Sequence, residues 1–362
     1  MKILIIQDRL RSGGTERQSV LLANAFTAAG HETTLLTFRP GGALADTVTT
    51  NVSRRVLQPF DTGLDWFAPR LYRTIAATIP DIILCMGRMA NCYAGGLQER
   101  FPTVTVIATM RTGKRLPRLF RRSLGIVRAV IANSHDAKTT LATEYAVPTE
   151  RISVIHNSLV FFATQPDGTR ETVRHEIGTT ATTIVMLCVA MFRPEKNQRE
   201  LIEITAGFPD TFDWNLWLVG DGPARAACEA LTAQKNLANR VKFLGWRADP
   251  APLYTAADIA VHASSSEALS NFLIEAQAQG LPAVAYEAQG ITECFVPGQT
   301  GFAIKRNEPD AFRAKIMQLG HAKTSERAVI SKQARDFATS SFDHDRQVEK
   351  YLALFKKLTG KQ

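Results

Sequence analysis

The chain has 362 residues, which is enough for two domains that each bury a hydrophobic core. A hydrophobic content of 45% and a charged content of 21% exclude a disordered polymer, and no apolar run reaches the roughly 18 residues of a membrane-spanning helix. The net charge of +9 comes wholly from residues 1–160, which hold 20 Lys and Arg against 11 Asp and Glu, whereas residues 161–362 hold 23 of each. We therefore expect the first half to meet an anionic partner.

Short apolar runs alternate with helical patterns along the first half. Residues 1–8 turn polar too early for a signal peptide, and we interpret them as the first strand. That first strand is expected at 2–6, and further strands are expected at 32–37, 82–85, 103–108 and 130–132. Residues 18–29 have helical spacing and stop before Gly30, which is typical of a helix C-terminus. Strand, helix and strand in close succession predict a parallel sheet with right-handed crossovers.

The second half repeats this pattern. Strands are expected at 183–189, 215–219, 241–244, 259–262, 283–286 and 301–304. The polar, turn-rich segment 163–169 separates the two halves. We therefore predict an α/β protein with two Rossmann-like, doubly wound domains, 1–162 and 163–343, followed by a helix within 344–362.

The cysteines bear on the cellular compartment. There are five of them, scattered along the chain, and no two form a Cys-x-x-Cys pair. Such a set favours buried thiols in a reducing compartment over disulfides or zinc ligands. We therefore expect a cytoplasmic protein without a metal centre.

The segment 264–282 carries the strongest chemical pattern. Glu267 lies in a serine-rich loop, and Glu275 lies eight positions later in a helical pattern that Gly280 closes. Ser270, between them, is the expected N-cap. A loop that leads into a helix start presents unpaired backbone N–H groups and the positive end of the helix dipole, which suits a phosphate. A glutamate one turn further in could bind a sugar hydroxyl, so the segment predicts a nucleotide-sugar site.

Other polar residues also follow expected strands. Arg193 and Lys196 come after the strand at 183–189, at the edge where a parallel sheet binds its ligands. A guanidinium fork and a mobile ammonium group together suit a diphosphate. Gly13 and Gly14 follow the first strand, and we expect them to adopt positive φ and let the backbone approach a ligand. Their spacing is not Gly-x-Gly-x-x-Gly, which disfavours a dinucleotide-binding dehydrogenase.

Six motifs in order resemble the retaining glycosyltransferases of family 4, which have the GT-B fold. They are the glycines at 13–14 with Thr15 and Glu16, the segments 189–197, 218–223 and 241–245, the Glu267–Glu275 pair around Ser270-Asn271, and 290–293 with 298–301. The resemblance covers most of the chain. It implies two Rossmann-like domains that face each other across a cleft, with the helix in 344–362 returning to the first domain.

The resemblance also implies a role for each motif in transfer of a sugar from a nucleoside diphosphate. Arg193 and Lys196 would hold the donor phosphates, Glu267 would face the donor sugar, and Glu275 would bind the ribose. The implied catalytic residues are Glu267, Arg193 and Lys196, the donor-binding residues are Gly13, Gly14, Arg193, Lys196, Gly245, Leu269, Ser270 and Glu275, and the acceptor-binding residues are Thr15, Glu16 and Arg111. No Asp-x-Asp motif is present, so we expect protein cations rather than a metal ion to neutralise the phosphates.

Some of these positions have a second interpretation, and two depart from the family. Glu16 fits an acceptor contact or a first-turn helix charge, and Trp246, next to Gly245, fits a contact with the base or a place in the core. Arg111 stands in a region where many members carry a histidine near the reacting carbon. The turn at 156–159 is also altered, and we interpret His156 as a strand-end or interface residue rather than a catalyst.

Residues 111–128 form a basic segment. They hold seven Lys and Arg, no acidic residue and interleaved apolar residues, a pattern typical of a basic amphipathic helix. Such a surface can dock on anionic lipid, although a solvated helix face fits the same pattern. The predicted membrane patch consists of Lys114, Arg115, Arg118, Arg121 and Arg122. No base-stacking or groove-reading motif supports nucleic acid as a partner.

These features lead to one hypothesis and two alternatives. We expect a metal-independent, retaining glycosyltransferase that moves a hexose or N-acetylhexosamine from a UDP- or GDP-sugar to a glycan or lipid-linked acceptor. It would act in cell-surface polysaccharide synthesis, in the cytoplasm and peripherally on the inner face of the membrane. The alternatives are a nucleotide-sugar epimerase or hydrolase of the same fold, and a non-catalytic membrane protein that binds a nucleotide-sugar.

Overall fold

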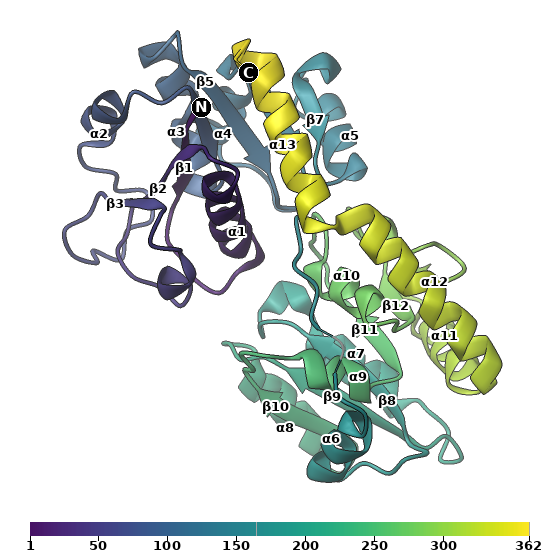
Figure 1. Ribbon diagram of the computed structural model, residues 1–362. Helices are drawn as coiled ribbons and strands as arrows, with labels where there is room; N and C mark the ends of the chain where they lie inside the picture. Colours follow the sequence, from purple (N-terminus) through teal and green to yellow (C-terminus); the bar gives the residue numbers. More distant parts are fainter. Residues whose placement is uncertain (164, 362) are drawn as a thin grey trace. The chain divides into compact units, whose positions relative to one another are not determined.

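The chain divides into two compact units (Figure 1). The computed structural model describes residues 1–163 and 165–361. Unit 1 comprises Met1–Ser158 and His344–Gln362, and unit 2 comprises Leu159–Asp343. The division falls after Ser158 rather than after Phe162, because Leu159 is buried in the core of unit 2 and Phe161 and Phe162 pack against that core.

Unit 1 is built on a seven-stranded parallel sheet with the strand order β3-β2-β1-β4-β5-β6-β7. The strands are β1 (Lys2–Gln7), β2 (Glu32–Thr37), β3 (Ser53–Val56), β4 (Ile82–Cys85), β5 (Thr105–Met110), β6 (Ala129–Ala132) and β7 (Ile152–Val154). The helices are α1 (Gly14–Ala28), α2 (Leu71–Thr78), α3 (Arg88–Arg100), α4 (Arg118–Ile126), α5 (His135–Thr143) and α13 (His344–Thr359), with short 3-10 turns η1 (Ala45–Thr47) and η2 (Thr149–Arg151).

The last helix, α13, completes the core of unit 1 (Figure 1). Tyr351 and Phe355 are fully buried, and their rings lie 6.0 and 5.5 Å from the ring of Phe26 on α1. The helical spacing of its apolar residues turns them to one side, where they cover one face of the sheet. Residues 344–359 therefore belong structurally to a unit whose other residues are more than 180 positions away.

Unit 2 has a six-stranded parallel sheet with the order β10-β9-β8-β11-β12-β13. Its strands are β8 (Ile184–Val189), β9 (Trp214–Val219), β10 (Val241–Gly245), β11 (Ile259–His262), β12 (Ala283–Tyr286) and β13 (Gly301–Ile304). Its helices are α6 (Thr169–Ile177), α7 (Gln198–Ala206), α8 (Arg225–Gln234), α9 (Ala251–Ala256), α10 (Asn271–Ala278), α11 (Pro309–Gly320) and α12 (Thr324–Phe342), with 3-10 turns η3 (Pro194–Lys196) and η4 (Thr292–Cys294).

The predicted strands are all present, and the sequence missed two. β3 has four exposed residues, Ser-Arg-Arg-Val, at the edge of its sheet, so it lacks the apolar run of a buried parallel strand. β7 is only three residues long. The helix expected to begin at Gln18 begins at Gly14. The sequence missed its first turn because Gln18 and Ser19 are polar although buried, so the apolar pattern becomes visible only after them.

Among the helices that the structure describes, none is both long enough and apolar enough to cross a bilayer.

Candidate functional site

The strand order of unit 2 determines where its polar side chains meet. From β8 the chain builds the sheet outward through β9 to β10, then returns to place β11 on the other side of β8. The loops that follow β8 and β11 therefore leave the same edge of the sheet in opposite directions. Ligands of open α/β sheets bind in the crevice at such a point.

Glu267 lies in the loop after β11, at this switch point of the sheet, and contacts one lysine and one histidine. Lys196, which ends η3 after β8, forms an ion pair with Glu267 Oε1. His262, the last residue of β11, places Nε2 2.8 Å from the same oxygen. Glu267 and His262 are both buried, whereas Lys196 is partly open to solvent. The lysine thus keeps an accessible face beside a fixed carboxylate.

The charge of Glu267 is set by these partners. Burial by itself would raise the pKa of Glu267, but the hydrogen bond with His262 and the charge of Lys196 outweigh it and lower the pKa to about 2. The carboxylate is therefore ionised throughout the physiological pH range.

The two loops are also joined through their backbones. The carbonyl of Glu195 accepts hydrogen bonds from the Ser265 amide at 2.7 Å and from the Ser264 hydroxyl at 2.9 Å. These bonds fix the serine-rich loop against η3. The position of Lys196 relative to Glu267 therefore does not depend on their ion pair alone.

A glycine turn after β9 closes the same edge of the sheet. Gly220 has φ +134° and Gly222 has φ +149°, and a Cβ on either would lie 2.2 or 2.4 Å from the carbonyl oxygen of Ala190 or Phe192. Only glycine allows this backbone to lie against the segment after β8. The turn at 218–223 thus supports Arg193, whose side chain is exposed and contacts the Met191 sulfur at 2.9 Å.

The start of α10 partly matches the expected phosphate seat. Ser270 is the N-cap, as predicted, and its hydroxyl accepts from the Leu273 amide at 3.4 Å. The Ser270 amide donates to Cys294 Sγ at 3.3 Å, so it already has a partner within the protein. Gly290, at φ +71°, has its backbone against the Ala268 carbonyl and the Leu269 amide, which explains the glycine of the 290–293 motif.

Glu275 and Gly245 each have a local partner. The carboxylate of Glu275 accepts from the hydroxyl of buried Tyr254 at 2.8 Å, a partner that fixes its direction on α10. Gly245 ends β10 at φ +69°, and its carbonyl accepts from the Gly220 amide at 2.8 Å. The neighbouring Trp246 is 60% exposed, so a place in the core is the wrong interpretation of that residue.

In unit 1, the glycines after β1 differ from the expectation. Neither Gly13 nor Gly14 has positive φ; Gly13 is the N-cap of α1 at φ −76°. A Cβ on Gly13 would lie 2.5 Å from Glu16 Oε2, so the glycine makes room for that carboxylate. Glu16 is in the first turn of α1, and the carbonyl of Thr15 accepts from the Ser19 hydroxyl.

Asp8 lies at the corresponding strand end of this sheet. It follows β1, and its carboxylate accepts from the amides of Met89 and Ala90 at the start of α3, at 3.0 and 2.9 Å. Burial raises the pKa of Asp8 to about 6, although the two backbone hydrogen bonds oppose the rise. The Asp8 carboxylate therefore satisfies two backbone amides at the start of α3, whose N-cap is Gly87.

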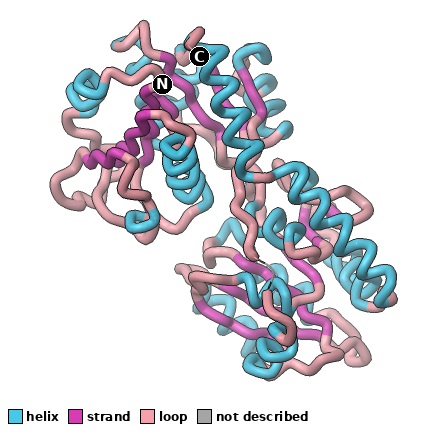
Figure 2. The backbone as a smooth tube through the Cα atoms, viewed as in Figure 1, coloured by secondary structure: helices cyan, strands magenta, loops and turns pink. Residues whose placement is uncertain are grey.

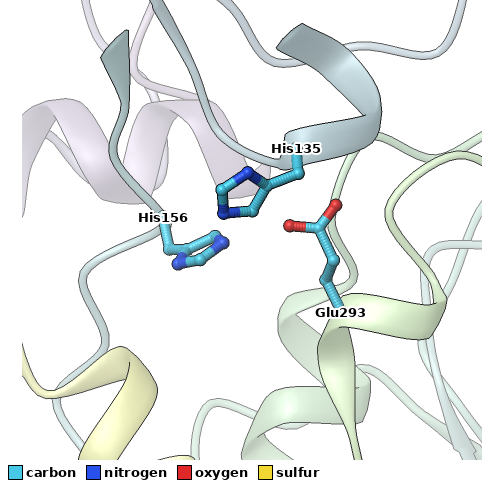
Figure 3. Close-up of side chains that lie close together, drawn as sticks. All are labelled: His135, His156 and Glu293. Carbon is cyan, nitrogen blue, oxygen red and sulfur yellow. The ribbon is translucent and has the colours of Figure 1, made fainter. Parts of the chain in front are cut away.

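Arg111 has partners within unit 1. One Nη donates to Asn157 Oδ1 at 2.6 Å and the other to the hydroxyl of Tyr351 on α13. The residue thus joins the ends of β5 and β7 to the last helix. Nearby, the rings of His135 and His156 lie 5.8 Å apart at the strand ends of the same unit (Figure 3); Glu293, also drawn there, belongs to unit 2.

The basic segment forms a shorter helix than expected, α4, preceded by a loop. Phe120, Leu124, Leu116 and Val127 are buried in the core of unit 1, so the apolar side of this helix already has a partner. Lys114, Arg115, Arg118, Arg121 and Arg122 are exposed. Of the apolar residues interleaved with them, Leu119 alone is largely exposed among the described residues.

Comparison with known proteins identifies both halves. The family model described as Glycosyltransferase Family 4 matches residues 12–159, and the model described as Glycosyl transferases group 1 matches residues 169–337. The chain belongs to the group 1 glycosyl transferases. This confirms the family that the six motifs indicated.

Two curated bacterial proteins are similar in sequence to this chain. The lipopolysaccharide core biosynthesis glycosyltransferase LpsE of Rhizobium meliloti is 29% identical over 50% of this chain and 52% of its own length. The N-acetyl-alpha-D-glucosaminyl L-malate synthase of Bacillus anthracis is 24% identical over 71% of this chain and 68% of its own. The match to LpsE thus spans about half the length of that relative.

Solved glycosyl transferase structures share the fold over nearly the whole chain. HepE of Anabaena, solved with UDP, superposes with a TM-score of 0.84 at 22% identity and covers 99% of this chain and 100% of its own. WaaG, described as involved in lipopolysaccharide biosynthesis, superposes with a TM-score of 0.75 at 17% identity, with 99% and 100% coverage. The predicted GT-B fold, with two Rossmann-like units, is confirmed.

The site includes two side chains that the sequence patterns did not single out. His262 is a buried polar residue at the end of an apolar strand, and Tyr254 precedes that strand in a short helix. A polar residue that ends a buried parallel strand is a usable signal for His262, because strand carboxyl ends face the ligand edge. No sequence pattern pointed to Tyr254, whose contact with Glu275 depends on how α9 and α10 are arranged.

Proposed function

We propose that the chain is a retaining glycosyltransferase that moves a hexose or N-acetylhexosamine from a nucleoside diphosphate sugar to a glycan or lipid-linked acceptor. The reaction breaks the bond between the anomeric carbon and the diphosphate oxygen. The acceptor hydroxyl forms the new bond on the same face of the sugar, and its proton leaves with the diphosphate. Cell-surface polysaccharide synthesis, on the cytoplasmic side of the membrane, is the process in which we place it.

One observation carries this proposal: Lys196 and Glu267 are fixed side by side at the switch point of the unit 2 sheet, and exposed Arg193 precedes Lys196 in the same turn. A departing diphosphate develops negative charge, and preorganised cations are the usual way to stabilise it. The ionised carboxylate of Glu267 is suited to accept a hydrogen bond from a sugar hydroxyl. In this proposal Arg193 and Lys196 replace a metal ion, Leu269 and Ser270 flank the phosphates, and Glu275 binds the ribose.

The donor base that we propose is uracil. Support comes from structural neighbours solved with UDP and with UDP-glucose, which share the fold at 22 and 23% identity. The exposed ring of Trp246, after Gly245, is a candidate partner for the base. GDP-sugars are the alternative donors in the test.

Unit 1 is proposed to bind the acceptor. It carries 25 Lys and Arg against 13 Asp and Glu, a balance of +12, whereas unit 2 carries 18 against 21, a balance of −3. An anionic or lipid-linked acceptor matches this charge. Thr15, Glu16 and Arg111 are the proposed contacts with the acceptor. Gly13 and Gly14 are proposed to border the donor. The cations of α4 are proposed to face anionic groups.

The donor is tested by thermal unfolding with UDP, GDP and their sugars, once in EDTA and once with Mg²⁺ in place of EDTA. A ligand that binds the native state raises the melting temperature by mass action. We expect UDP and UDP-sugars to raise it and GDP to leave it unchanged. If no nucleotide shifts the transition, the donor site is assigned wrongly; if a shift requires added Mg²⁺, metal independence is wrong.

The reaction is tested by incubation of the preferred UDP-sugar with a panel of glycan and lipid-linked acceptors. Product NMR should show that the anomeric configuration of the donor is kept. Release of UDP and free sugar at the same rate with and without acceptors would identify a hydrolase. An isomerised UDP-sugar would identify an epimerase, and donor binding without any turnover would leave a binding protein.

A further inference from the structure

Unit 2 has a hollow at the edge of its sheet opposite to Glu267. Its volume is about 550 Å³, which lies within the range of roughly 300–1,000 Å³ for small-molecule sites. Asp258 and Pro282, the residues just before β11 and β12, line it, whereas Glu267 follows β11. Helices α6, α9, α10 and α12 contribute to its walls, with α6 beside α9 and α12 beside α10 (Figure 2, where helices are cyan). The hollow is therefore separate from the proposed donor site.

Arginines dominate the charged lining of this hollow. Arg170 on α6 and both Arg327 and Arg335 on α12 line it, and Asp258 is the one acidic residue among the lining residues that the structure describes. Asp258 is buried, and Arg170 and Arg174 pair with its two carboxylate oxygens, each at 2.6 Å. Because these two pairs neutralise the acid, the hollow keeps an excess of positive charge.

Arg335 is the lining cation with the most unused hydrogen-bond capacity. Arg170 also donates to three backbone carbonyls at the end of α9, at 2.9–3.3 Å, and Arg327 donates to two backbone carbonyls near the end of α11. By contrast, Arg335 has a single hydrogen-bond partner among the described residues, the hydroxyl of Ser331, which accepts from Nη1 at 2.8 Å. The other N–H groups of its guanidinium are available to an anion.

A glycine at the end of α10 makes room for Arg335. Gly280 has φ +81°, and a Cβ on it would lie 2.3 Å from Arg335 Nη1 and 2.2 Å from Ser331 Oγ. Any other residue at position 280 would displace both groups. Arg327, Ser331 and Arg335 recur every four residues, which places them on one side of α12. The sequence thus presents this side of α12 to the hollow.

Apolar side chains form much of the remaining lining. They are those of Phe162, Leu281, Pro282, Leu319 and Ile330. An inorganic anion would leave this apolar surface uncovered, whereas a ligand with a ring or hydrocarbon part would bury it. Guanidinium groups bind phosphate through paired N–H groups. The lining therefore suits a ligand that has both an anionic group and an apolar part.

A column of rings connects the hollow with residues of the proposed donor site. Tyr254, which also lines the hollow, stacks on Phe162 with ring centroids 5.8 Å apart and on Phe272 with ring centroids 6.1 Å apart. The ring of Phe272 lies 5.8 Å from the ring of His262. The hydroxyl of Tyr254 donates to the carboxylate of Glu275 at 2.8 Å. A ligand in the hollow would thus pack against the stacked rings that fix Glu275.

We propose that this hollow is a regulatory site for a small organic phosphate, a phosphate ester of a compact ring. Arg335 binds the phosphate, Arg327 adds positive charge, and the apolar side chains cover the ring. The occupant supports Tyr254, and through it Glu275, so that the donor binds more tightly. Binding of the phosphate is independent of the transfer reaction, whereas its effect on the donor rests on the proposed function.

Binding is tested by ligand-observed NMR titration of the full chain with phenyl phosphate, inorganic phosphate and benzyl alcohol. We expect phenyl phosphate to bind most tightly, because it alone offers both a phosphate and a ring. Arg335→Gln should weaken its binding by about tenfold, the usual effect of losing a hydrogen bond to a charged group. The matched control is Lys332→Gln on the same helix, since Lys332 is exposed, pairs with Asp336 and is not among the lining residues described. It should change the affinity by less than about twofold.

A second experiment separates the hollow from the donor site, where a phosphate could also bind. Phenyl phosphate is titrated again with saturating UDP and into Lys196→Ala, and we expect its binding to persist in both. The Kd for UDP, measured by isothermal titration, should fall by about fivefold when phenyl phosphate is saturating. Tyr254→Phe keeps the ring but loses the bond to Glu275, so it should abolish that gain while phenyl phosphate still binds.

Three outcomes would overturn this proposal. Loss of phenyl phosphate binding in Lys196→Ala but not in Arg335→Gln would mean that the phosphate occupies the donor site. Equal affinity for benzyl alcohol and phenyl phosphate would mean that the hollow does not select an anion. An unchanged Kd for UDP at saturating phenyl phosphate would exclude regulation. Failure of UDP to bind the wild-type chain at all would instead refute the donor site, and Arg335→Gln would still decide whether the hollow binds a phosphate.

Discussion

At the scale of single residues, the candidate site depends on the protonation state of one buried carboxylate. Glu267 is nearly inaccessible to solvent, yet its pKa is low because His262 and Lys196 stabilise the charged form more than burial penalises it. A buried ion pair of this kind is costly to break on one side only, because the remaining charge has no partner. Substitutions here should therefore affect both stability and donor binding.

The first prediction concerns acid stability. Because the folded-state pKa of Glu267, about 2, is below the ordinary value of 4.5, its contribution is complete above about pH 5 and is lost as pH falls from 4.5 towards 2. That contribution is on the order of 3 kcal/mol. Urea unfolding of the wild type and Glu267→Gln should show a gap in unfolding free energy that narrows between pH 5 and pH 3. A gap that stays constant over this range would contradict the assigned pKa.

The second prediction concerns the cation beside that carboxylate. Lys196→Ala should lower kcat/KM for sugar transfer by roughly 10²- to 10³-fold, as expected when one preorganised stabiliser of developing charge is removed. Lys235→Ala is the matched control, because Lys235 forms a surface ion pair with Glu203 at 2.8 Å and should leave kcat/KM unchanged. Steady-state kinetics with a UDP-sugar measure both. His262→Gln, which keeps a donor for Glu267, should lose less than Lys196→Ala if His262 only positions the carboxylate.

At the scale of elements, helix starts and tight turns determine which groups face the ligand edge. Ser270 is the N-cap of α10 and Ser134 is the N-cap of α5, and in both the cap hydroxyl accepts a backbone hydrogen bond from the third residue after it. The two caps are chemically alike but belong to different units. They therefore provide a pair of variants with similar local effects and different functional consequences.

The third prediction uses this pair. Ser270→Ala and Ser134→Ala should each reduce the free energy of unfolding by about 1 kcal/mol, the usual cost of a lost N-cap. Only Ser270→Ala should also weaken UDP binding, because α10 starts beside the proposed phosphate seat. Urea unfolding and isothermal titration with UDP measure the two effects. Equal UDP affinity in both variants would mean that the start of α10 does not contribute to the donor site.

At the scale of the whole molecule, the end of the chain stabilises its beginning. Val348, Tyr351 and Phe355 of α13 are buried in unit 1, and Tyr351 also accepts from Arg111. Burial of side chains of this size contributes about 1.5–3 kcal/mol each, and their sum is a large part of the stability of a typical domain. Unit 2 has its own core clusters, to which α13 does not contribute.

The fourth prediction follows from this division. A chain truncated after Asp343 should lose the folded structure of unit 1 while unit 2 stays folded. Limited proteolysis with mass spectrometry should show cleavage spreading through residues 1–158 and a protected fragment within 159–343. Tyr351→Phe, which removes only the hydroxyl, should keep unit 1 folded and cost about 1 kcal/mol. Protection of residues 1–158 in the truncated chain would contradict the role assigned to α13.

Particular residues show where sequence reasoning succeeded and where it failed. Ser270 was identified as an N-cap from local spacing, and the structure confirms it. The expected positive φ at Gly13 and Gly14 was wrong, since the neighbouring Glu16 carboxylate rather than backbone strain explains a glycine at position 13. For Leu119, Phe120 and Leu124, helical spacing indicated an apolar stripe but could not say what covers it. The core of unit 1 covers Phe120 and Leu124, and leaves Leu119 to solvent.

The sequence by itself determined the elements and their order, because strand and helix patterns, caps and glycine turns are local properties of a few neighbouring residues. It also determined which residues follow strand ends, and hence which side chains were candidates for the site. Only the tertiary structure decided that β11 lies beside β8, so that Lys196 meets Glu267 from 71 positions away, at the same oxygen that His262 contacts. The placement of β11 depends on the side of β8 to which the crossover connection returns. The burial of whole sheet faces determines that side, and no local sequence pattern does.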